Sequence, residues 1–97
     1  MRDGARLVKR RPWRVVFTKQ AQKDAKRIAE AGLREKTLAL LDILEGNPFR
    51  HPPPFARLVG DLAGALSRRI NIQRRLVYQV LKKTRTVKIL RMWTLYD

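Results

Sequence analysis

A proline-rich segment divides this sequence into two parts that are expected to fold differently. Four of the five prolines lie within residues 46–54, together with Gly46 and Asn47. Proline has no backbone N–H and disfavours helix at the residue before it, so this segment is expected to be an extended loop. A chain of 97 residues suits a single domain. The two parts are therefore expected to share one compact core.

The part before the loop has the pattern of one short strand followed by two helices. Residues 13–17 are aromatic and β-branched, which indicates a strand, and Thr18 is a suitable helix N-cap. Gly32 is expected to end the first helix, and a second is expected over about 33–45. Leu38 and Ile43 widen the apolar face of this second helix, which is therefore expected to be well buried. The helix-spaced apolar positions are Ala21, Ala25, Ile28 and Ala29 in the first helix and Leu33, Leu40, Leu41 and Leu44 in the second.

The part after the loop has the pattern of strands. Residues 65–71, 75–81 and 86–94 are expected to form an antiparallel meander, with residues 82–85 as the turn between the last two strands. The predicted fold class is α+β, with a two-helix hairpin packed on one face of a small antiparallel sheet. The other face would be left open, and the arginines of these strands are expected to collect there.

The charge of the chain is unbalanced, and the imbalance is concentrated after the loop. Lysine and arginine number 23 against 8 acidic residues, a net charge of +15, and no acid occurs between Asp61 and Asp97. A basic face can serve solubility alone, but such an excess favours binding of a polyphosphate, because each neutralised phosphate releases counterions. The bases of this acid-free stretch are Arg68, Arg69, Arg74, Arg75, Lys82, Lys83, Arg85, Lys88 and Arg91.

Composition argues against several other classes of protein. There is no cysteine and a single histidine, His51, so neither a metal site nor another cofactor is expected; His51 itself is expected to be a loop residue facing solvent, with a catalytic role as the alternative. No apolar run approaches the roughly 20 residues that span a bilayer, and no signal peptide is evident, so a cytoplasmic protein with no membrane partner is expected. Residues 1–12 are expected to be a basic, flexible tail, and residues 13–97 the domain.

RNA is the polyanion that these residues suit best. Cleavage by attack of the 2′-OH needs a general base, a general acid and a cation on the phosphate oxygens. Arg69 and Arg75 flank a tight strand connection and are expected to hold one phosphate, while Tyr96 could stack on a base or donate a hydrogen bond. Tyr78 fits the core better, and Trp93 fits either place. Further RNA contacts are expected from Arg68, Arg74, Lys82, Lys83 and Arg91.

Several motifs resemble the Txe/YoeB toxins of type II toxin–antitoxin modules, over roughly residues 13–97. They are the run LVGDLAGALSRRI from Leu58, the run RLVYQV from Arg75 and the ending RMWTLY from Arg91. The resemblance implies a RelE-like fold, cleavage of mRNA in the ribosomal A site, and a YefM/Phd-like antitoxin as partner; it leaves homodimerisation open. It also implies that Arg69 and Arg75 polarise the phosphate and that Tyr96 is the family's terminal tyrosine.

Three positions depart from the pattern of that family. Ala56 stands where members usually have the general-base glutamate, Arg74 where they have histidine, and Leu95 where they have the near-terminal histidine. Alanine and leucine cannot transfer protons, so general acid–base contributions worth roughly 10²–10⁴-fold each are expected to be lost. The expectation is a toxin that still holds RNA but cuts weakly or not at all.

Two other interpretations stay open at this point. The chain could be a non-catalytic protein that binds RNA or the ribosome, or one that titrates an antitoxin. It could also be an unrelated DNA-binding domain, although it has no helix-turn-helix spacing and no recognition helix rich in Arg, Asn or Gln.

Overall fold

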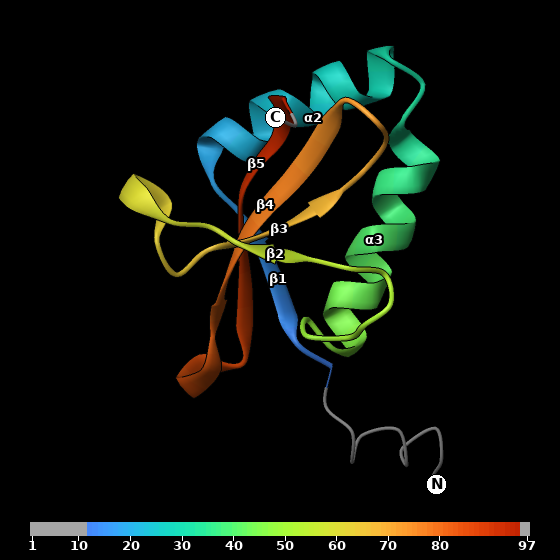
Figure 1. Ribbon diagram of the computed structural model, residues 1–97. Coiled ribbons are helices and arrows are strands. Elements are labelled where there is room, and N and C mark those ends of the chain that lie inside the picture. The colour runs from blue at the N-terminus through green and yellow to red at the C-terminus, as the bar shows by residue number, and fades with distance from the viewer. Residues whose placement is uncertain (1–11, 96–97) are drawn as a thin grey trace, which may run out of the picture.

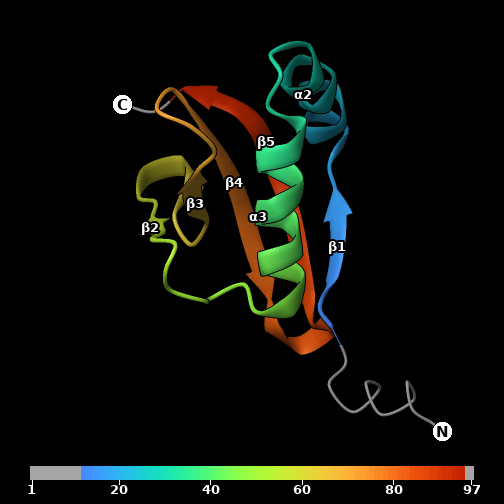
Figure 2. The same ribbon diagram turned by 90° about the vertical axis from the view of Figure 1, so that its right-hand side faces the viewer.

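The computed structural model describes residues 12–95 as a five-stranded sheet with two helices packed on it (Figure 1). The sheet order is β1-β5-β4-β3-β2. Helix α3 lies across the sheet, and α2 lies near the C-terminal end of β5 (Figure 2). The elements are β1 (Arg14–Phe17), α2 (Lys19–Glu30), α3 (Arg34–Gly46), β2 (Ala56–Arg57), β3 (Leu66–Arg69), β4 (Arg74–Leu81) and β5 (Thr86–Leu95), with single 3₁₀ turns η1 (Gly60–Leu62) and η2 (Lys82–Thr84).

The predicted α+β class and the helical hairpin are confirmed, but the sheet is mixed. Strands β2, β3, β4 and β5 pair antiparallel in sequence order, whereas β1 pairs parallel with β5, with Val15 opposite Val87. The prediction of an antiparallel sheet is therefore wrong at this edge. The two helices carry the chain from β1 at one edge of the sheet to β2 at the other edge, and the meander from β2 to β5 then brings β5 beside β1.

The predicted helix boundaries hold because their capping chemistry is local. The Thr18 hydroxyl accepts a hydrogen bond from the Ala21 N–H and caps α2. Gly32 follows with φ +74°, a left-handed conformation that lets the chain turn into α3. Helix α3 is less buried than expected, because Leu38 is 43% exposed. Its buried positions are Thr37, Leu40 and Leu44.

One hydrophobic cluster joins both helices to the sheet. Tyr78 belongs to it and is fully buried, which confirms the expectation that it is a core residue. Residues two apart on a strand share a face, so the same strands present alternate side chains on the side away from this cluster. The buried members are Ala21, Ile28, Leu33, Leu40, Leu44, Leu66, Ile70, Leu76, Tyr78, Val87, Ile89 and Met92.

Candidate nucleic-acid interface

Arg68 lies inside the protein rather than on its surface. It is 1% exposed and donates from Nη1 to the carbonyl of Pro53 (2.6 Å) and from Nη2 to those of Pro48 (3.1 Å) and Arg50 (2.8 Å). Its Nε donates to the Tyr78 hydroxyl at 3.0 Å. The prediction that Arg68 contacts RNA is therefore wrong. The alternation of strand β3 turns this guanidinium toward the core, where it ties down the proline-rich loop.

Tyr78 completes the attachment of this loop. Its hydroxyl donates to the Pro48 carbonyl at 3.1 Å and accepts from Arg68. Burial raises the pKa of Tyr78 above its ordinary value, and the nearby Arg68 guanidinium opposes this only in part. The hydroxyl therefore remains protonated and able to donate. The loop that precedes Ala56 is held from below by two side chains of the sheet.

Arg69 and Arg75 lie on the other face of the same strands. They are direct cross-strand partners at the end of the β3–β4 pair, which confirms that the tight connection brings them together. Arg69 is exposed and Arg75 is half-buried, and Nη1 of Arg75 donates to the Ser67 hydroxyl at 3.3 Å. Like charges directly opposite one another destabilise a sheet, so this position suits an anion that both guanidinium groups can share.

A hollow of about 350 Å³ adjoins Arg69 on this face. The described residues that line it are Pro54, Phe55, Ala56, Ser67 and Arg69, and none of these can accept a proton near neutral pH. Ala56 lies opposite Ser67 across the β2–β3 pair. Ala56, where the resemblance implies a general-base glutamate in other members, thus lies in the same hollow as Arg69. His51 does not line this hollow; it is exposed, and its ring centre lies 6.4 Å from that of Phe55.

Arg74 is engaged with an aromatic ring. Its guanidinium carbon lies 3.7 Å above the centre of the half-buried Trp93 ring, and Nη1 donates to the Trp93 carbonyl at 3.3 Å. The stacked ring orients this cation at the start of β4. The backbone of Leu95 pairs with Arg74, one residue along from Arg75 and Thr94. Tyr96, predicted to be a site residue, lies outside the described residues.

Arg91 makes an ion pair that sequence reasoning missed. Its Nε donates to the Asp24 carboxylate at 2.9 Å, and the backbone N–H groups of Met92 and Trp93 donate to the same oxygen. Burial alone would raise the pKa of Asp24, but the hydrogen bonds from Arg91, Met92 and Gln20 hold it below its ordinary value. Arg91 still exposes 42% of its side chain. Its predicted contact with RNA therefore stays a prediction.

The predicted bases Lys82 and Lys83 are exposed at the β4–β5 turn, at the other end of the strands from Arg69 and Arg75. The structure thus separates the predicted RNA-binding residues into two places.

In the described part of the chain no three His, Cys, Asp or Glu side chains are grouped so that they could hold a metal ion. Among the same residues, no helix has the length and apolar character to cross a membrane.

Comparison with known proteins finds matches among solved structures, and these are toxins of toxin–antitoxin systems. No family model matches the sequence, and no curated protein matches it. A YoeB/ParE toxin from Agrobacterium tumefaciens is 27% identical with a TM-score of 0.76, covering 86% of this chain and 99% of that one. The YoeB–YefM complex from Staphylococcus aureus is 29% identical with a TM-score of 0.71, covering 87% and 98%.

A third match is the RelBE2 toxin–antitoxin complex from Mycobacterium tuberculosis. It is 30% identical with a TM-score of 0.61, and the alignment covers 89% of this chain and 94% of that one. Such coverage leaves little of either chain unaccounted for. The fold and these similarities agree: the chain belongs to the RelE-like toxins of toxin–antitoxin systems.

Proposed function

We propose that this RelE-like toxin binds mRNA on the ribosome through Arg69 and Arg75 and cleaves it weakly or not at all. The observation that carries the proposal is the hollow beside Arg69. Its lining offers cationic and hydroxyl groups from Arg69 and Ser67, but Ala56 occupies the place from which a carboxylate could reach a ribose. Among the described residues, the hollow has groups that can hold a phosphate and none that can activate the 2′-OH.

Each step of RNA cleavage makes a different demand on this site. Two guanidinium groups can stabilise charge on the phosphate oxygens, as Arg69 and Arg75 are placed to do. Removal of the 2′ proton and protonation of the leaving 5′ oxygen require groups that exchange protons near neutral pH. Neither alanine nor leucine does so, which leaves Tyr96 as the one predicted catalytic residue that carries a hydroxyl. Tyr96 is proposed to contact the RNA rather than to replace both groups.

A ribosome-bound mRNA cleavage assay tests the proposal. The double variant Ala56→Glu with Leu95→His is expected to cleave at least roughly 10²-fold faster than the natural sequence, because general acid–base catalysis contributes about that much or more. Ala39→Glu is the matched control, since it adds the same charge on an exposed position of α3. Robust and equal cleavage by the natural sequence and the double variant would refute the proposed attenuation.

An antitoxin is the proposed protein partner. The YoeB–YefM structure and the RelBE2 structure are both toxin–antitoxin complexes, and Arg69 presents positive charge on an exposed position. An acidic segment of a YefM/Phd-like antitoxin would complement that charge. Arg69→Glu is expected to weaken such a complex. Unchanged binding would show that the antitoxin binds elsewhere on the toxin.

A non-catalytic role is the second candidate, and the lack of a carboxylate at Ala56 favours it as well. A chain that binds RNA or the ribosome without cutting, or that titrates an antitoxin, would need no proton-transfer groups. Growth arrest on expression distinguishes the two. An attenuated toxin still arrests growth when it is produced without antitoxin, and the arrest is lost in Arg75→Ala; a purely titrating protein causes none.

A further inference from the structure

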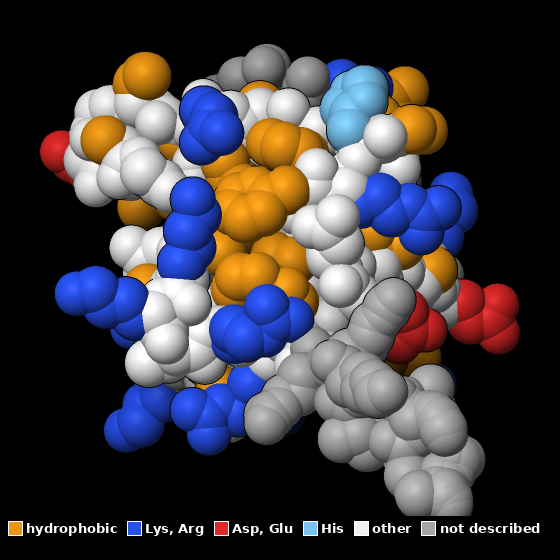
Figure 3. All heavy atoms as spheres, turned by 90° about the horizontal axis from the view of Figure 1, so that it is seen from below, with side chains coloured by type: hydrophobic (Ala, Val, Ile, Leu, Met, Phe, Trp, Pro, Cys, Tyr) orange, Lys and Arg blue, Asp and Glu red, His pale blue; other side chains and the backbone are white. Residues whose placement is uncertain are grey.

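The end of the molecule that carries the β4–β5 turn has a second concentration of positive charge. Figure 3 shows hydrophobic side chains in the middle of this end and lysine and arginine side chains around them. We refer to it as the turn-end surface. It consists of the half-buried rings of Trp13 and Phe49 and the exposed cations Arg14, Lys82, Lys83 and Arg85.

The aromatic rings of the turn-end surface hold two of its cations. Lys82 Nζ lies 5.5 Å from the centre of the Phe49 ring, and the Arg85 guanidinium carbon lies 4.7 Å from that of Trp13. The rings meet edge to face, with centres 6.4 Å apart, and the backbone N–H of Trp13 donates to the Glu45 backbone carbonyl at 2.8 Å. Cations held on rings lose less conformational freedom when they bind an anion.

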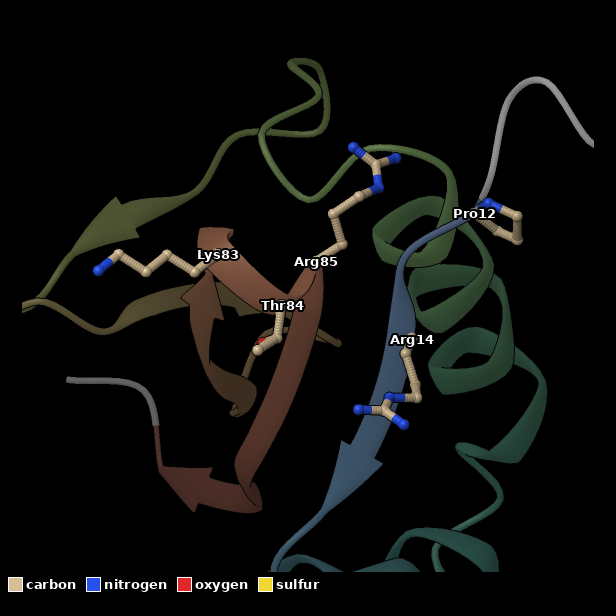
Figure 4. A pocket seen from close by; sticks show the side chains of 5 residues that line it. All are labelled: Pro12, Arg14, Lys83, Thr84 and Arg85. Atoms are coloured by element: carbon tan, nitrogen blue, oxygen red, sulfur yellow. The ribbon is translucent and has the colours of Figure 1, made fainter.

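The backbone of the turn places Arg14 beside Arg85. Arg85 has φ +49°, a left-handed conformation, and its carbonyl accepts from the Arg14 N–H at 2.9 Å, which ties β1 to the turn. A hollow of about 320 Å³ lies here, lined by Pro12, Arg14, Lys83, Thr84 and Arg85. Figure 4 shows these basic side chains spreading from the backbone in different directions. That spread does not converge on one small ion; it fits an extended anion.

We propose that the turn-end surface binds the phosphate backbone of a structured RNA, as a contact separate from the Arg69–Arg75 site. From Arg75 to Leu81 strand β4 advances six residues, about 20 Å at roughly 3.3 Å per residue. One phosphate therefore cannot reach both places. This contact is additional to the mRNA binding proposed at Arg69 and Arg75. It would give the protein a second RNA contact at the far end of its sheet.

The chemistry of this surface favours phosphates over bases and over a protein segment. The faces of Trp13 and Phe49 that could stack on a base are covered by Arg85 and Lys82. Protein interfaces are usually anchored by an aromatic or aliphatic side chain in a pocket, and here the rings hold cations instead. The stretch from Leu62 to Tyr96, which supplies Lys82, Lys83 and Arg85, contains no acid. Glu45, at the end of α3, is the acid whose backbone contacts Trp13.

Binding of the purified protein to a labelled RNA hairpin, measured by fluorescence anisotropy at several salt concentrations, tests this proposal. The double variant Lys82→Ala with Lys83→Ala is expected to bind roughly tenfold or more weakly. The slope of log affinity against log salt should fall by about 1.4 to 1.8, for two phosphate contacts of roughly 0.7 to 0.9 each. The matched control is Lys23→Ala with Lys26→Ala, which removes the same charge from exposed positions of α2.

Equal losses in both double variants would overturn the proposal, because net charge alone would then explain the binding. An equal loss of affinity for a polyglutamate peptide would overturn the assignment to RNA and make the surface a docking site for acidic proteins. The hairpin assay contains no ribosome and measures no cleavage, so its outcome does not depend on that of the Ala56→Glu experiment. Urea unfolding of each variant verifies that the fold is retained.

Discussion

Strands β3 and β4 carry arginines on both faces, and each face uses them for a different purpose. On the face toward the helices, Arg68 is buried and donates to three loop carbonyls and the Tyr78 hydroxyl. On the other face, the next residue along, Arg69, is exposed beside a hollow and opposite Arg75. A shift of one residue along a strand separates an arginine that maintains the fold from one that is placed to bind a ligand.

This contrast explains why net charge is a poor guide to the number of ligand contacts. Burying a guanidinium costs free energy unless its donors are satisfied, and the carbonyls of the proline-rich loop satisfy those of Arg68. The loop in turn leads into Ala56, which lines the hollow beside Arg69. The buried Arg68 thus holds the loop that leads into the hollow beside the exposed Arg69.

The largest predicted effect follows from removing the buried arginine. Arg68→Met keeps the length of the side chain but removes the donor to the Pro53 and Arg50 carbonyls and one of two donors to the Pro48 carbonyl. The free energy of unfolding is therefore expected to fall by at least about 3 kcal/mol. Arg69→Met, one residue away, should change it by less than about 0.5 kcal/mol. Urea unfolding of both variants measures the difference. Equal losses would show that the two faces do not differ in this way.

A smaller effect is expected at Asp24, the other buried charge on the helical side of the sheet. Asp24→Asn replaces a carboxylate that accepts from Gln20, Arg91, Met92 and Trp93, and is expected to cost about 2 kcal/mol at neutral pH. The stability that comes from the lowered pKa of Asp24 is present above its ordinary value of about 4 and is lost as pH falls through the lower folded-state value.

Urea midpoints at neutral and at acidic pH check this prediction. The natural sequence should lose stability on acidification, and Asp24→Asn should lose less, because it no longer has the carboxylate to protonate. Glu30→Gln on the same helix is the control, since that side chain is exposed. A difference between Asp24→Asn and the natural sequence that stays constant with pH would contradict the ionic role of Asp24.

Sequence patterns predicted the elements of the fold well where the signals were local. The cap at Thr18, the left-handed Gly32 and the alternation in β3 to β5 each depend on residues close in the sequence. The parallel pairing of β1 with β5 joins residues about seventy positions apart, and no local pattern encodes it. Leu38 has an apolar side chain on a face of α3 that the sheet does not cover. The apolar pattern of this helix therefore predicted more burial than the structure shows.

The candidate site could be predicted only in part, for a related reason. A tight strand connection brought Arg69 and Arg75 together as expected, because their separation along the chain is short. Whether Arg68 serves a ligand or the core depended on a loop fifteen to twenty residues away. Asp24 was missed although it lies three residues after Ala21 and four before Ile28, on the apolar face of α2. An acid at such a position signals a buried partner.

The smallest predicted effect is on the exposed face, where a substitution should weaken RNA binding and leave the stability of the fold nearly unchanged. Arg69→Ala is expected to weaken binding of single-stranded RNA roughly tenfold, about 1.4 kcal/mol, through loss of a charged hydrogen bond to phosphate. Its effect on unfolding should stay within about 0.5 kcal/mol, because removing one of two opposed cations relieves repulsion with Arg75. Anisotropy and urea unfolding of the same preparation measure both quantities.

Lys36→Ala provides the control for this last variant, since it removes one positive charge from an exposed position on α3. It should reduce RNA affinity much less than Arg69→Ala, because screening at physiological salt limits the influence of a distant exposed charge. If both variants weakened binding equally, the RNA would be responding to total charge. If Arg69→Ala instead destabilised the fold by several kcal/mol, the exposed face would depend on its arginines as the buried face does. A loss confined to binding would mean that β3 uses one arginine to hold the loop and the next to hold the ligand.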